Sequence, residues 1–262
     1  MLRNHIKAGP ALQHFTVRGK GDSRLEALSD GVFALAIAML LLSTSVPETF
    51  DELWRLFSDL IPFGICSVFI FWIWRSQVIF FQRYGLTEDQ RVIRLSFALL
   101  MLVLFYVYAL KFLMNWLINF FSGGLRSLIY DLPLRETVGY LMEVVNFMDM
   151  PKLMLIYGLG FMGVFMLFAL LYRYVLQHQG TLELSPLERL ETQHSSYQYQ
   201  GMVVVGGVAV FFAVLGLFSD WPWFSFLSGM AYNLAIPFSF RLSSWRKKAL
   251  VQAGLEREES ND

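Results

Sequence analysis

Residues 24–46 read RLEALSDGVFALAIAMLLLSTSV, and Pro47 follows them. A helix needs about 20 mostly apolar residues to cross roughly 30 Å of hydrocarbon, because each residue adds about 1.5 Å. The stretch reaches that length, and a proline just beyond it is a typical signal for the end of a helix. It therefore predicts a membrane-spanning helix that begins near Arg24.

Five further stretches of the chain are apolar and approach the same length. They are residues 56–81, 92–120, 152–176, 202–218 and 223–240. Between them, residues 121–150 are polar and indicate an external loop, and residues 177–200 indicate a linker with one short helical turn after Ser185. We therefore expect an all-α, polytopic membrane protein with six transmembrane helices in each subunit.

The positions of lysine and arginine predict how these helices are oriented, because positively charged loops remain in the cytoplasm. The loop after the first stretch is acidic, whereas Arg83, Arg91 and Arg94 follow the second stretch. The segment that begins at Arg241 is also basic. With an even number of helices, both termini are expected in the cytoplasm of a protein of the cell membrane.

Composition supports the same organisation. Hydrophobic residues make up 56% of the 262 residues, and the charged residues lie in blocks between apolar runs, which argues against a soluble protein. The 21 basic and 21 acidic residues balance, so no general attraction to nucleic acid is implied. We expect a cytoplasmic segment at residues 1–23, a six-helix transmembrane domain at 24–240, and a basic and then disordered tail at 241–262.

Signals of catalysis are poor. The four histidines lie in terminal or linker segments without the spacing of metal ligands, and the chain contains neither a nucleophile elbow nor a phosphate-binding loop. The single cysteine, Cys66, lies in an apolar run and is typical of a core residue. We expect no enzymatic activity, no metal site and no cofactor.

The start of the first helix carries a motif. Arg24 is followed by three residues and then by Leu28-Ser29-Asp30. This pattern resembles the signature of the transmembrane protein 175 family of lysosomal and bacterial potassium channels, which is arginine, three residues and then Phe-Ser-Asp. Leu28 stands in the place of the aromatic residue.

A second similarity to this family lies at the end of the second helix. Trp74 matches the family's tryptophan, Gln77 takes the place of its histidine, and Leu95 or Ser96 lies near the place of a family asparagine in the third helix. The resemblance implies a polar network that holds the first helix, formed here by Arg24, Ser29, Asp30, Trp74 and Gln77. From the sequence alone, Ser29 and Asp30 could instead cap the start of the helix.

One face of the first helix is a candidate pore lining. Leu35, Ala38, Met39 and Leu42 share that face, because spacings of three, four and seven residues recur on one side of a helix. Such a stripe is usually ordinary packing. The resemblance implies a pore with its main constriction at Leu35, and a hydrophobic constriction excludes ions when it dewets.

The resemblance also implies the permeant ion and the assembly. Many family members have a hydroxyl residue eight positions after the aspartate, where this chain has Ala38, so we expect a modest preference for K⁺ over Na⁺. One pore helix per chain cannot enclose a path, which requires a symmetric oligomer. Six-helix members are tetramers, so the expected partners are three further copies of the chain and membrane lipids.

Two other functions compete with a channel. A secondary transporter could use helices broken at glycines to form a substrate site near the middle of the membrane. Close helix contacts explain the same glycines more simply; they are Gly158, Gly160, Gly163, Gly206 and Gly207. A membrane scaffold without transport is the third possibility.

Overall fold

The structure analysed is a computed structural model of the whole chain. It describes residues 15–19, 23–42, 48–51, 53, 60–130, 147–219, 221 and 223–252. Within the helices, it leaves out the side chains of residues 41–42, 62, 114–115, 117–130, 147 and 252. The described part of the chain is helical and contains no strand, as the apolar runs predict.

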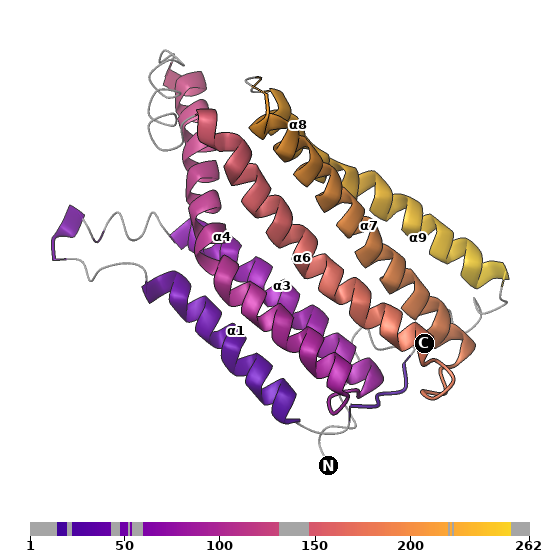
Figure 1. Ribbon diagram of the computed structural model, residues 1–262. Coiled ribbons are helices and arrows are strands. Elements are labelled where there is room, and N and C mark those ends of the chain that lie inside the picture. Colours follow the sequence, from indigo (N-terminus) through magenta and orange to yellow (C-terminus); the bar gives the residue numbers. More distant parts are fainter. Residues whose placement is uncertain are drawn as a thin grey trace.

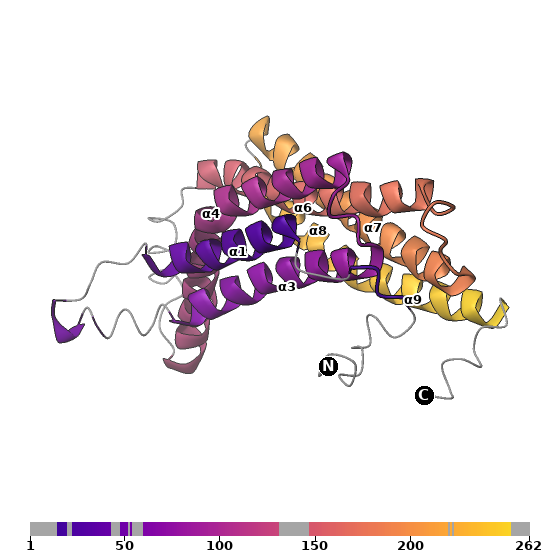
Figure 2. The ribbon, with the colours of Figure 1, turned by 90° about the horizontal axis from the view of Figure 1, so that it is seen from below.

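The helices run side by side across the molecule (Figure 1). Figure 1 shows α1 at one edge and α9 at the opposite edge, and Figure 2 shows α1 lying between α3 and α4. In chain order the helices are α1 (Arg24–Leu42), α3 (Leu60–Tyr84), α4 (Gln90–Tyr130), α6 (Met150–Gln177), α7 (Pro186–Leu217), α8 (Trp223–Ala231) and α9 (Ala235–Gln252).

Four of these helices are long and apolar enough to cross a membrane. The candidate spans in the described residues are Phe63–Tyr84, Gln90–Leu113, Met150–Gln177 and Pro186–Leu217. An apolar segment of this length forms a helix in the membrane, because only a helix satisfies every backbone hydrogen bond of a single segment within hydrocarbon. The chain is therefore a helical membrane protein, and the full number of six spans remains a prediction.

The expectation of a loop from residue 121 onward is wrong at its start, because α4 continues to Tyr130. Gly123 and Gly124 lie inside this helix rather than at its end. A glycine costs an exposed helix only about 1 kcal/mol relative to alanine, whereas a proline breaks it, and the next proline is Pro133. The rest of the expected loop, residues 131–146, lies outside the described residues.

The expected linker at residues 177–200 is also wrong in extent. The helix α7 begins at Pro186, with Ser185 as its N-cap and Glu188 completing a capping box. The first four turns of α7 are polar, so they gave no hydropathy signal. The capping box favours a helix at this point. The low hydropathy does not argue against one, because hydropathy measures the affinity for the membrane and not the helical state.

The expected sixth span, residues 223–240, consists of two helices. The helix α8 ends at Ala231, and a 3₁₀ turn at Tyr232–Leu234 joins it to α9. The side-chain amide of Asn233 donates a hydrogen bond to the carbonyl of Met230 at 3.2 Å in this turn. The helix α9 then continues well beyond residue 240 and includes the basic residues of the expected tail.

The segment 15–19 connects the end of α3 to the start of α7. The backbone N–H groups of Arg18 and Gly19 donate to the carbonyl of Gln82, near the end of α3, at 3.1 and 3.3 Å. The guanidinium of Arg18 donates to both carboxylate oxygens of Glu188, in the first turn of α7, at 2.8 and 2.9 Å. This clamp joins elements that lie far apart in the sequence.

Candidate pore helix

The start of α1 is set by a capping box. The hydroxyl of Ser23 accepts a hydrogen bond from the N–H of Glu26 at 3.1 Å, and the Glu26 carboxylate accepts one from the N–H of Ser23 at 2.9 Å. The helix therefore begins at Arg24, and Ser29 and Asp30 lie in its second turn. The alternative that these two residues cap the helix is wrong.

The two sides of α1 differ sharply in exposure. Phe33, Ala36 and Leu40 are 3%, 0% and 1% exposed, and they face α3 and α4. On the other side, Leu28 and Leu35 are 51% and 48% exposed, seven residues apart and therefore in line along the helix. The neighbouring residues on this open face are small, and they are Ala27, Gly31 and Ala34.

Two neighbouring polar residues of α1 are held by α3. The indole N–H of Trp74 donates a hydrogen bond to the Asp30 carboxylate at 2.6 Å. The amide N–H of Gln77 donates to the Ser29 hydroxyl at 3.3 Å, and this glutamine is 1% exposed. Trp74 and Gln77 are one helical turn apart and meet residues of α1 in reverse order, so the two helices are antiparallel.

Of the expected network, only Arg24 is not joined to these pairs. Arg24 is exposed and forms no hydrogen bond or ion pair with the residues that the structure describes. Ser96 is buried in α4, and its hydroxyl has no hydrogen-bond partner in the described part of the chain. The amide oxygen of Gln77 is likewise buried without such a partner.

The four residues of the expected constriction differ in their surroundings. Leu35 lies on the open face of α1. Ala38 and Met39 are half-buried, and Met39 packs against the core of the same subunit. The side chain of Leu42, the last residue of α1, lies outside the described residues. A helical wheel of α1 alone does not show which of these residues are buried, because the exposure of each depends on how α1 is rotated against its neighbours.

Lys111 supports the far end of α1, and we did not single it out in the sequence. Its ammonium group donates a hydrogen bond to the carbonyl of Leu40 at 2.8 Å. The last carbonyls of a helix have no partner within the helix, so this contact satisfies one of them. A lysine within the apolar run of α4 is the signal that could have identified it, because an ionisable residue at such a position needs a partner.

The open face of α1 contains no catalytic chemistry. Beyond Arg24 at its start, the face presents the side chains of leucine and alanine and the backbone of Gly31. This surface suits contact with lipid, with another copy of the chain or with a dewetted ion path. The described residues also contain no group of three or more histidine, cysteine, aspartate or glutamate side chains placed to hold a metal ion.

Comparisons with known proteins identify relatives of the chain. Residues 24–106 match the family model described as endosomal/lysosomal potassium channel TMEM175. A protein of Marivirga tractuosa named as a potassium channel is 35% identical over 244 residues, which cover 91% of this chain and 94% of that protein. The crystal structure of a variant of the potassium channel MtTMEM175, bound to a nanobody–MBP fusion, matches with a TM-score of 0.77 and 34% identity, over 93% of this chain and 100% of that one.

Proposed function

Because the chain belongs to the TMEM175 family of potassium channels, we propose that it is a K⁺-permeable channel of the cell membrane whose pore is lined by the open face of α1. In this proposal Leu35 forms the main hydrophobic constriction. Ions pass when the ring of leucine side chains is wet and wide enough, and they are excluded when it dewets.

The observation that carries the proposal is the uncovered apolar face of a helix that is otherwise firmly held. Contacts from Trp74, Gln77 and Lys111 position α1 against α3 and α4 at both ends. The opposite face, with Leu28 and Leu35, meets nothing within the described part of the subunit that covers it. A helix at the edge of its subunit, as Figure 1 shows, is placed to meet copies of itself around a symmetry axis.

The proposed assembly is a homotetramer with α1 of each subunit at the centre and with six transmembrane helices per subunit. Both termini lie in the cytoplasm. Selectivity must then come from side chains and constriction width, since α1 is helical throughout residues 24–42 and its carbonyls bond along the helix. With Ala38 in place of a hydroxyl residue, the proposed preference for K⁺ over Na⁺ is modest.

A carrier mechanism is less well supported. The helices α6 and α7 are continuous through all five glycines that a broken-helix site would use. A Cβ atom at Gly158 would lie 2.8 Å from Val210, and one at Gly206 would lie 3.1 Å from Met162. Gly158 and Gly206 therefore serve the close packing of α6 against α7. Gly160 and Gly163 instead face Tyr106 and Leu102 of α4, and a Cβ at Gly207 would meet no atom within 4 Å.

The experiment is a single-channel recording of the purified protein in a planar bilayer with K⁺ and Na⁺ gradients. Leu35→Ala is expected to increase the unitary K⁺ current and to lower the K⁺/Na⁺ permeability ratio, because a smaller side chain widens and wets the constriction. Leu170→Ala is the matched control, since Leu170 is a leucine of a different helix, α6, and is 40% exposed.

Three outcomes would contradict the proposal. An unchanged conductance and permeability ratio in Leu35→Ala would remove Leu35 from the ion path. An equal effect of Leu170→Ala would mean that the change is not specific to α1. Saturable, coupled flux without unitary currents in the unchanged protein would identify a carrier instead.

A further inference from the structure

The helix α9 combines an apolar first part with a basic second part. Its sequence contains Arg241, Arg246, Lys247 and Lys248 and no acidic residue. Figure 1 shows α9 at the edge of the bundle opposite α1. One side of α9 is therefore left open by the described part of the chain, and this side is available to a partner outside the subunit.

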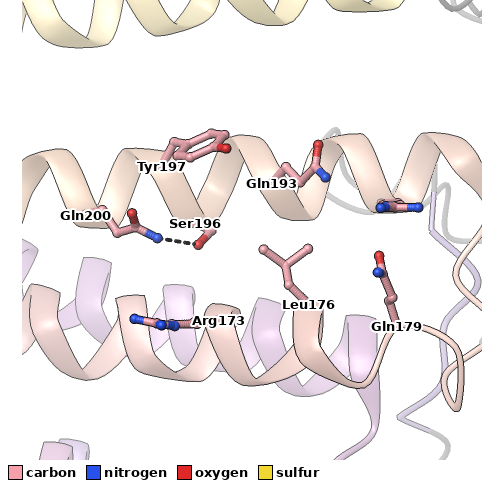
Figure 3. Close-up of a pocket in the computed structure, with 8 residues that line it drawn as sticks. Arg173, Leu176, Gln179, Gln193, Ser196, Tyr197 and Gln200 are labelled. Atoms are coloured by element: carbon pink, nitrogen blue, oxygen red, sulfur yellow. Dashed lines mark hydrogen bonds between the residues drawn. The ribbon is translucent and has the colours of Figure 1, made fainter.

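The other side of α9 packs on the polar first part of α7. The Arg246 guanidinium donates a hydrogen bond to the Glu191 carboxylate at 2.6 Å, and the rings of Trp245 and Tyr197 lie 5.7 Å apart. Figure 3 shows Tyr197 among the polar side chains of this part of α7. The basic part of α9 thus lies beside the polar turns of α7, which precede the apolar run of that helix.

This pairing indicates the level of the membrane surface on α9. Tryptophan and tyrosine are enriched where hydrocarbon gives way to headgroups, because their rings are apolar and their N–H and O–H groups are polar. Trp245 and Tyr197 meet at the point where α7 changes from polar to apolar. The residues of α9 around Trp245 are therefore at the level of the phospholipid headgroups.

The open side of α9 changes from apolar to basic along its length. Ile236 and Phe240 are 58% and 70% exposed. Lys247 follows Phe240 after seven residues and lies in line with both, and Arg241 and Lys248 lie beside this line. We call these five residues the outer face of α9.

The positive charge of the outer face is not neutralised within the described part of the chain. Arg241, Lys247 and Lys248 are exposed, and none of them forms an ion pair or a side-chain hydrogen bond with a described residue. Arg246 differs, because its charge is compensated by Glu191 at 2.6 Å. Three positive charges therefore remain on a surface whose neighbouring residues are apolar.

We propose that the outer face of α9 binds an anionic phospholipid. The acyl chain lies along Ile236 and Phe240, and the headgroup lies among the three basic side chains, whose long stems reach toward the headgroup level. The attraction is electrostatic and acts over roughly 8 Å at physiological salt, so the cations need not converge on one atom.

The order of apolar and basic residues favours an anionic lipid over other partners. A soluble acidic peptide would match the basic part of the outer face and leave Ile236 and Phe240 exposed. A zwitterionic phospholipid would match the apolar part and leave the positive charge uncompensated. An anionic phospholipid matches both parts, and the inference does not depend on which helix lines the ion path.

The experiment measures lipid binding to the purified full-length protein in a non-ionic detergent by native mass spectrometry. Phosphatidylglycerol and phosphatidylcholine with the same acyl chains are titrated separately. The test variant is Arg241→Gln/Lys247→Gln/Lys248→Gln. Its matched control is Arg75→Gln/Arg94→Gln/Arg173→Gln, which removes the same charge from exposed arginines of α3, α4 and α6.

The unchanged protein is expected to bind phosphatidylglycerol at least about fivefold more tightly than phosphatidylcholine, since each basic residue near an anionic surface contributes about that factor. The test variant is expected to lose this preference while it still binds phosphatidylcholine, which also shows that it is folded. Lys247→Gln/Lys248→Gln, a smaller change, is expected to lose part of the preference. The control is expected to keep it.

Four results would overturn the proposal. The first is equal binding of the two lipids by the unchanged protein, and the second is a test variant that keeps the preference. The third is an equal loss in the control, which would assign the preference to net charge. The fourth is binding of hexaglutamate without any lipid preference, which would identify an acidic peptide as the partner.

The acidic residues that follow α9 in the sequence are the remaining competitor for the outer face. They include Glu258 and Glu259. Glu258→Gln/Glu259→Gln is expected to keep the preference of the unchanged protein for phosphatidylglycerol. A preference that appears only in this variant would overturn the proposal and identify the end of the chain itself as the occupant.

Discussion

The contact between Trp74 and Asp30 shows how single residues hold the candidate pore helix. A carboxylate near the membrane is costly unless a partner satisfies it, and a group on a neighbouring helix is needed because Arg24, six residues away, lies on a different face of α1. In this structure the donor is the indole N–H of Trp74, at 2.6 Å, and Arg24 is not involved. A hydrogen bond to a charged acceptor is worth about 1.5–3 kcal/mol when it is sheltered from water.

A double-mutant cycle tests this contact. Trp74→Phe removes the donor and Asp30→Ala removes the acceptor, so each single change is expected to lower stability by about 1 kcal/mol, at the low end because Asp30 is exposed. The double variant is expected to lose less than the sum of the two losses. The measurement is the temperature at which the assembled protein disappears from gel filtration.

Trp72→Phe is the control for this cycle, because Trp72 lies on the same helix and is 43% exposed. It is expected to leave the assembly temperature nearly unchanged. Strictly additive losses at residues 74 and 30 would show that the two side chains act independently and that their hydrogen bond contributes nothing to the position of α1.

At the scale of the element, α1 is a helix held at both ends and open along one side. The capping box at Ser23 and Glu26 satisfies its first N–H groups, and Lys111 satisfies a carbonyl near its end. The middle of the helix contributes Phe33 and Ala36 to the core. The residues of the open face are therefore not needed to hold α1 in its subunit. A helix face that lines a pore has to be available in this way.

Lys111→Met tests the support at the end of α1. Methionine keeps much of the length and apolar contact of lysine but cannot donate to the Leu40 carbonyl, so stability is expected to fall by about 1–3 kcal/mol. Lys152→Met is the matched control, since Lys152 forms an exposed ion pair with Asp149 three residues away. Such pairs are worth about 0–1 kcal/mol. The measurement is thermal unfolding of the purified protein, and equal losses in both variants would reject a special role for Lys111.

At the scale of the whole molecule, the clamp between Arg18 and Glu188 determines how the two halves of the bundle meet. The Glu188 side chain is 2% exposed and also accepts hydrogen bonds from the N–H groups of Thr16 and Ser185 at 2.8 and 2.9 Å. A nearby cluster of rings packs α3 on α6, where Phe80 and Tyr172 lie 5.4 Å apart. Together, these contacts fix the segment before α1 against the start of α7.

Removal of one partner of the clamp is expected to be more damaging than removal of both. Arg18→Gln leaves a buried carboxylate without its cation and is expected to cost about 3–5 kcal/mol. Arg18→Gln/Glu188→Gln removes both charges and is expected to recover part of that loss. Arg94→Gln, an exposed arginine of α4, is the control. Thermal unfolding checks all three, and a double variant that is less stable than Arg18→Gln would refute the interpretation.

The sequence by itself determined the class of the protein, the start of α1 near Arg24 and the family, and the comparisons confirm the family. These features are local or compositional. An apolar run of bilayer length can only be a helix, and the motif at Leu28-Ser29-Asp30 is contiguous. The polar start of α7 and the extension of α4 were missed because hydropathy does not report on helical segments that contain many polar residues.

Only the tertiary structure decided which groups meet. Trp74 bonds Asp30 across 44 residues, and Arg18 bonds Glu188 across 170. The sequence did not show which side of α1 is open either. Leu35 is exposed and Met39 is half-buried because of the way in which α1 packs on α3 and α4. Helical periodicity places residues around an axis, but the rotation of that axis is set by neighbours that are distant in the chain.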